Sequence, residues 1–160
     1  MFKRKQQIEE FIDEVLSGNT QERALAFVTY LRTNDMAIIR FTYHGKDTLH
    51  WEVKYKGKLV CYILLDAENS GWTIKPDHSA ASRFADYPID DAMKEIAWQN
   101  LAVCVNGQCG GCEKGTGITL MTFGKEIENV CPMPYEFTNP NDFALRLAIK
   151  MMDVRKADIK

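Results

Sequence analysis

The stretch HWEVKYKGKLVCYILL, residues 50–65, carries the strongest indication of the fold. In its first half, Trp51, Val53 and Tyr55 alternate with polar or charged residues. This alternation predicts a strand with one buried face and one solvated face. After a Lys-Gly-Lys turn, residues 59–65 are apolar throughout, which predicts a central strand covered on both faces. The stretch therefore predicts an antiparallel hairpin inside a sheet.

The same signals extend to either side and predict antiparallel strands across residues 36–76. Residues 37–43 are rich in Ile and aromatic residues, and residues 72–76 alternate until a proline ends strand pairing. Further along the chain, residues 118–123 predict another strand, and residues 132–137 predict an extended edge. We therefore expect one antiparallel sheet of about 4–6 strands.

Helices are predicted before and after these strands. Residues 1–35 contain two apolar stripes separated by a glycine, which predicts an N-terminal αα-hairpin. A middle helix is expected at residues 89–101 and a C-terminal helix at residues 139–156, with Asn139 as N-cap and Pro140 at the first helical position. The apolar stripe of this last helix consists of Phe143, Leu147, Met151 and Val154. The predicted class is α+β, with these helices packed on the sheet.

Composition limits the classes of partner. A chain of 160 residues suits one domain, residues 1–160, and its formal net charge of −2 makes a nucleic-acid partner unlikely. The sequence has no apolar run of about 20 residues, so we expect no membrane span. Its basic start leads into no apolar signal run, which favours a cytoplasmic location. Thiols stay reduced there, so clustered cysteines indicate metal or redox chemistry before disulfides.

Four cysteines form the densest group of chemically active residues. Within the Cys-rich segment 102–131 they are separated by four, two and 18 residues, and they are Cys104, Cys109, Cys112 and Cys131. Four thiolates are a common ligand set for structural zinc, and a Cys-x2-Cys pair closes easily on one ion. Such a site has no open coordination position. The cluster therefore predicts a structural zinc site that stabilises the C-terminal third of the chain.

Two alternatives stay open for the cluster. Cys-x4-Cys-x2-Cys with a distant fourth cysteine is the plant-type [2Fe–2S] spacing. The segment from Cys104 to Cys112 also resembles the ferredoxin-like domains of molybdenum hydroxylases, in glycine placement as well as in spacing. That resemblance implies an electron-transfer domain. The other alternative is a metal-free module that binds a small molecule, in which the cysteines are reduced thiols.

Aromatic residues are numerous for a sheet of this size. A small α+β module can hold an apolar ligand against such rings. The rings predicted to bind a ligand are Trp51, Tyr55, Tyr62, Trp72 and Trp98. No His, Ser, Cys or acidic residue stands in a recognisable catalytic arrangement, which favours a protein that is not an enzyme.

Several short stretches resemble a group of proteins. Residues 55–62, the FGKE of residues 123–126 and the NVC of residues 129–131 are similar to short uncharacterised bacterial proteins that share a domain of unknown function. The similarity runs from about residue 36 to the end. More loosely, the strand around residues 56–58 is similar to YdhG-like domains. Both resemblances imply a fold class and no reaction.

The predicted function combines these features. We expect a non-enzymatic domain with a structural four-cysteine metal site, whose partner is a small molecule or a protein. The sequence gives no indication of the oligomeric state.

Overall fold

Two antiparallel sheets and four α-helices make up the described part of the chain, which confirms the predicted α+β class. The structure is a computed structural model that describes residues 5–43, 46–105 and 117–160. Its elements, in chain order, are α1 (Ile8–Val15), α2 (Gly18–Thr33), β1 (Ala37–Tyr43), β2 (Lys46–Tyr55), β3 (Lys58–Asp66), β4 (Gly71–Pro76), the 3-10 helix η1 (His78–Phe84), α3 (Asp91–Gln99), β5 (Leu101–Val103), β6 (Ile118–Thr122), β7 (Lys125–Tyr135), β8 (Phe137–Thr138) and α4 (Asp142–Asp158).

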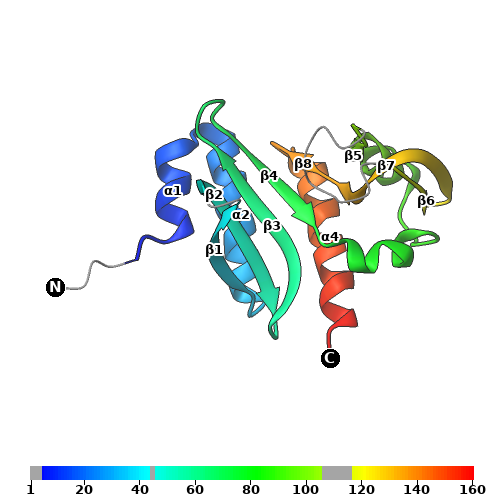
Figure 1. Ribbon diagram of the computed structural model, residues 1–160, viewed down its shortest axis with the longest axis horizontal. Helices are drawn as coiled ribbons and strands as arrows, with labels where there is room; N and C mark the ends of the chain where they lie inside the picture. Colours follow the sequence, from blue (N-terminus) through cyan, green and yellow to red (C-terminus); the bar gives the residue numbers. More distant parts are fainter. Residues whose placement is uncertain (1–4, 44–45, 106–116) are drawn as a thin grey trace.

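The larger sheet has five strands in the order β1-β2-β3-β4-β8 (Figure 1). The hairpin predicted from residues 50–65 is its β2–β3 pair, in which Trp51 lies opposite Ile63 and Glu52 opposite Tyr62. Successive side chains of a strand point to opposite faces, so this register separates a fully apolar face from a mixed one. The first face carries Trp51, Val53, Cys61 and Ile63, all buried.

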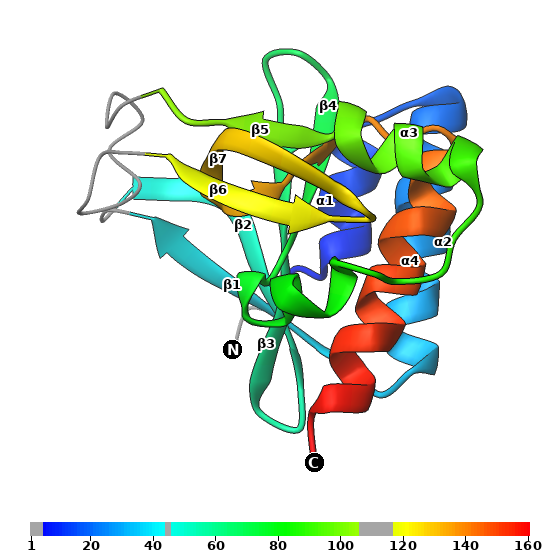
Figure 2. The same ribbon diagram turned by 90° about the vertical axis from the view of Figure 1, so that its right-hand side faces the viewer.

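Three helices cover that apolar face. Figure 2 shows α2 and α4 running side by side along one side of the strands, and α1 packs against α2 and β3. The ring of Phe11 in α1 lies 5.4 Å from that of Trp51, and Phe27 in α2 lies 5.9 Å from Trp72. Burying each such ring stabilises the fold by about 1.5–3 kcal/mol. None of the described helices is both long and apolar enough to cross a membrane.

The smaller sheet has the order β5-β7-β6, so the segment with two prolines is its central strand. In the β5–β7 pair, Leu101 lies opposite Tyr135 and Val103 opposite Val130, with a register shift between them. Pro132 and Pro134 fall within that shift. Proline has no N–H to donate, which explains why regular pairing stops there. The sequence predicted one sheet, but the strands between residues 101 and 135 form this second one, and only β8 returns to the larger sheet.

The two sheets join where β7 continues into β8. Between these strands the Glu136 N–H donates to the Asn100 carbonyl at 2.9 Å. Behind the join, Phe84 of η1 packs against Phe123 and Tyr135 at ring distances of 5.7 and 6.1 Å. The stretch 77–88 looks like a loop in the sequence, but it contains η1 and contributes the buried Phe84 to the core.

The start of α4 differs from the prediction. Asn141, rather than Asn139, is the N-cap, and its side chain accepts from the Ala144 N–H at 2.9 Å. Asn139 instead has a positive φ of 45° and bonds to β4. Phe143, predicted on the inner face, is 56% exposed, and the buried face of the helix begins at Ala144. Because α4 begins at Asp142, Phe143 lies in its first turn, and the residues that face the sheet follow it.

Candidate functional site

A cavity of about 630 Å³ lies between the two sheets. The smaller sheet lies beyond β4, on the side of the larger sheet away from α1 (Figure 1). The floor of the cavity is the face of the larger sheet that the helices leave uncovered, and it consists of Phe41, His50, Tyr62, Leu64 and Lys75. The opposite wall consists of Ala102, Val103, Cys104, Val105, Cys131, Pro132, Met133 and Glu136.

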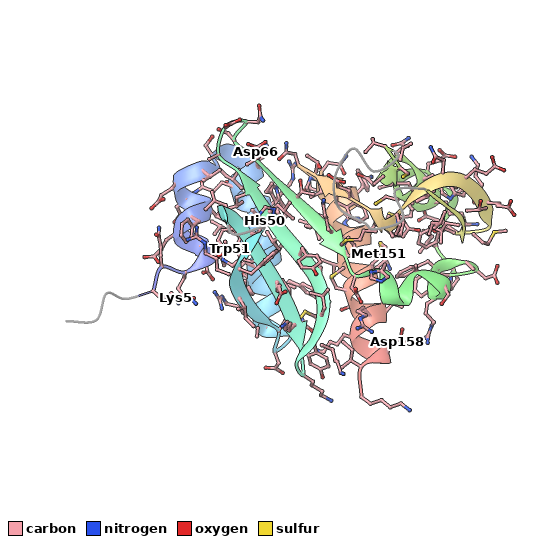
Figure 3. The ribbon with its side chains drawn as sticks, viewed as in Figure 1. Lys5, His50, Trp51, Asp66, Met151 and Asp158 are labelled. Carbon is pink, nitrogen blue, oxygen red and sulfur yellow. The ribbon has the colours of Figure 1, made fainter. Side chains whose placement is uncertain are left out.

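Strand pairing brings the floor residues together. Phe41 lies opposite His50, which lies opposite Leu64, while Tyr62 lies opposite Lys75. The ring of Phe41 is 5.6 Å from that of His50 and 5.7 Å from that of Tyr62. Figure 3 labels His50 beside Trp51, the neighbour in β2 whose ring packs against α1 on the opposite face. The floor is therefore a contiguous aromatic and aliphatic surface.

Two charged groups lie at this surface. The Lys75 Nζ is 4.0 Å from Glu136 Oε2, an ion pair that is too long for a hydrogen bond. Burial, followed by the charge of Lys75, lowers the pKa of His50. Burial, followed by the charge of Glu52, raises the pKa of Tyr62. At neutral pH the imidazole and the phenol are thus both uncharged, and Lys75 and Glu136 are the remaining basic and acidic residues of the lining among the residues that the structure describes.

Two of the predicted metal ligands line this cavity. Cys104 follows β5, and its N–H donates to the Asn129 carbonyl of β7 at 2.9 Å, while Cys131 belongs to β7 itself. Val103 pairs with Val130, so Cys104 and Cys131 each directly follow a residue of that pair. Both cysteines therefore lie beside the same residue pair of the smaller sheet, and both line the cavity.

The other two predicted ligands, Cys109 and Cys112, lie outside the described residues. Within the described ranges, no group of three or more His, Cys, Asp or Glu residues could hold a metal ion. The four-cysteine site therefore stays a prediction. The remaining cysteine, Cys61, is fully buried on the helix-covered face, and burial strongly raises its pKa.

The five aromatic residues predicted to bind a ligand do not share one pocket. Only Tyr62 lines the cavity, while Trp51 and Trp72 are buried beneath the helices. Tyr55 lies at the far end of its strand, where the Lys156 Nζ is 4.9 Å from its ring centroid. Trp98 of α3 donates to the Thr122 carbonyl at 3.0 Å. Strand alternation separates them, because Trp51 and Tyr62 stand on opposite faces of the sheet.

Four floor residues were missed at the level of sequence: Phe41, His50, Leu64 and Lys75. The alternation that puts Trp51 inside also puts His50 on the other face, which the sequence indicated was solvated. The sequence also puts Tyr62 and Leu64 on that face, and these two large side chains were the available indication that another part of the chain stands over it.

No protein-family model, curated protein or solved structure gave a significant match to this chain. The resemblances found in the sequence therefore stay predictions.

Proposed function

We propose that this protein is a non-enzymatic binding module that takes a small, largely apolar molecule into the cavity between its two sheets. The observation that carries the proposal is the cavity itself, whose volume of about 630 Å³ lies within the range typical of small-molecule sites. Its lining is predominantly apolar and has a few converging polar groups, as such sites usually do.

The composition of the floor also supports binding of an apolar molecule. Phe41, Tyr62 and Leu64 stand on a face that the helices do not cover, where a sheet would ordinarily carry polar residues. Covering this face with a ligand would remove apolar surface from water at about 25 cal/mol per Å². Exposed apolar surface inside a cavity is thus a source of binding free energy.

The test uses N-phenyl-1-naphthylamine, an uncharged fluorescent probe, titrated into the whole protein. Binding is expected with one site per chain and an increase in fluorescence. Ala102→Trp adds an indole to the cavity wall and is expected to abolish binding. Thr119→Trp adds the same group at an exposed position of β6 outside the cavity and is expected to leave binding unchanged. Equal binding by both variants would show that the probe binds elsewhere and would contradict the proposal.

A second candidate function is a four-cysteine metal site, most simply structural zinc. It is favoured by one observation: Cys104, directly after β5, and Cys131, on the neighbouring strand β7, line a single cavity. Cys109 and Cys112 would complete a tetrahedral set. In that case the metal would connect the end of β5 to β7 and stabilise the smaller sheet.

Element analysis of protein purified without a His-tag tests this second function. One equivalent of zinc is expected, and it should be lost in Cys104→Ser and in Cys131→Ser. Cys61→Ala is the matched control and should keep its metal, since Cys61 lies on the opposite side of the larger sheet. Iron with visible absorption after anaerobic purification would instead support the [2Fe–2S] alternative. Less than about a tenth of an equivalent of either metal would contradict both.

A further inference from the structure

We infer that the molecule bound in the cavity carries an anionic group, and that Lys75 together with Tyr62 holds that group. The inference rests on the proposed binding function and adds the chemical class of the ligand. It starts from the floor of the cavity, where Lys75 on β4, with its ammonium group, is paired with Tyr62 on β3, with its hydroxyl group.

Lys75 and Tyr62 are directly opposite each other in the β3–β4 ladder, and both line the cavity. Side chains of a directly opposed pair have Cβ atoms about 4.5–5.5 Å apart on the same face of a sheet. Both side chains therefore leave the sheet on the cavity face, and an ammonium and a phenolic hydroxyl are both donors that an oxyanion accepts from. Tyr62 is suited to that role because its phenol keeps its proton at neutral pH.

The other polar side chains of the described lining are His50, Cys104, Cys131 and Glu136, and Glu136 supplies its only carboxylate. An ammonium paired with a phenolic hydroxyl favours a ligand with a charged acceptor. A cationic ligand would find a single carboxylate and would have to approach Lys75.

Glu136 is the group that an incoming anion must displace. Its Oε2 lies 4.0 Å from the Lys75 Nζ, and its side chain is 41% exposed, compared with 32% for Lys75. An ion pair as exposed as this contributes little free energy, so breaking it costs little. Glu136 is also a like charge for the ligand, so its removal should strengthen binding of an anion.

The test compares two probes with the same ring skeleton. 8-Anilinonaphthalene-1-sulfonate is anionic, whereas N-phenyl-1-naphthylamine lacks the sulfonate. The wild-type protein is expected to bind the sulfonate about tenfold more tightly, as one charge-assisted hydrogen bond would give. Lys75→Met should remove this preference and change the affinity for the neutral probe by less than about twofold. Glu136→Gln should increase affinity for the sulfonate alone.

Lys54→Met is the matched control. Lys54 lies on the same face of the larger sheet, 3.0 Å from Glu52, but it does not line the cavity. It should leave the affinity for both probes unchanged. Equal affinity of the wild-type protein for the two probes, or a preference that persists in Lys75→Met, would overturn the inference while the proposed binding function stands. Failure to bind either probe would overturn both. Binding of the neutral probe by each variant also shows that its cavity has folded.

Discussion

Asn139 and Trp72 exchange two hydrogen bonds at the point where β8 ends beside β4. The Trp72 N–H donates to Asn139 Oδ1 at 2.9 Å, and the Asn139 N–H donates to the Trp72 carbonyl at 2.8 Å. Asn139 has a positive φ of 45°, which Asn adopts more readily than most residues. This pair closes the β4–β8 ladder just after Thr138, and it therefore helps to hold β8 on the larger sheet.

Asn139→Ala is expected to lower the free energy of unfolding by about 2 kcal/mol. The change leaves the Trp72 N–H without its side-chain acceptor and places a Cβ-bearing residue without a local hydrogen bond at positive φ. Asn139→Gly restores the conformational freedom and loses only the hydrogen bond, so about 1 kcal/mol is expected. Urea unfolding measures both values. If the Ala variant were as stable as the Gly variant, the positive φ of residue 139 would make no contribution to the free energy of unfolding.

Arg155→Met is expected to destabilise the fold by about 3 kcal/mol. The Arg155 Nε lies 3.3 Å from Asp77 Oδ2 and also donates to the Leu59 carbonyl at 3.0 Å, and the Asp77 side chain is only 6% exposed. Removing one partner of a buried ion pair leaves a charge without its main compensation.

The matched control is Arg83→Met, which breaks an ion pair with Asp158 whose arginine is 60% exposed. Its expected cost is below about 1 kcal/mol. Similar costs for both variants in urea unfolding would refute this distinction.

Cys61 and Cys131 should differ sharply in their reactivity toward iodoacetamide. Cys61 is fully buried and its pKa is raised by burial, so neither access nor thiolate formation favours reaction. Cys131 is half-buried at the cavity and should react at least about tenfold faster in metal-free native protein. Peptide mapping by mass spectrometry after timed alkylation identifies each site. Alkylation of Cys61 at the rate of Cys131 before unfolding would mean that the larger sheet opens readily.

His50 should make the protein less stable as the pH falls from 7.5 to about 5.5. Burial, and then the charge of Lys75, lowers the pKa of His50 in the folded state, so the unfolded chain binds this proton more readily. The stability that the uncharged His50 contributes is fully present above the unfolded pKa of about 6.5. It is lost as the pH falls toward the pKa of the folded state.

His50→Gln should flatten the dependence of the melting temperature on pH in this window. His78→Gln is the comparison variant, because His78 is 62% exposed, lies 3.6 Å from Asp77 and does not line the cavity. The carboxyl groups whose pKa is lowered, including Glu9 beside Arg32 and Asp142 beside Arg23, act only at more acidic pH. An unchanged pH profile in His50→Gln would contradict the prediction.

Much of the fold could be predicted from local patterns. The alternation around Trp51 and the apolar run after it predicted the central hairpin, and the helix predicted at residues 89–101 is α3 (Asp91–Gln99). Predictions failed where two local signals competed. Asn139 and Asn141 are both good caps, and only the hydrogen bonds of Asn139 to Trp72 assign the cap to Asn141. Pro132 and Pro134 indicated an edge, yet β7 is central because its pairing with β5 shifts where they occur.

The candidate site was predicted less completely. The sequence pointed to Tyr62 as one of five aromatic rings and to the cysteines as one cluster, but it did not pair Tyr62 with Lys75 or place Cys104 and Cys131 on the cavity wall. Those relationships depend on register and on how the second sheet is positioned. Neither is encoded in the spacing of residues along the chain.

The sequence by itself determined the α+β class, the central hairpin and the division of its side chains between two faces, because a strand period of two residues is a local property. Only the tertiary structure decided what covers the second face. Helices cover the face with Trp51, whereas the smaller sheet stands over the face with His50 and leaves a cavity. The physical reason is that β8, which follows β7 after a single residue, is held on β4 by contacts such as that of Asn139 with Trp72, between residues 67 positions apart.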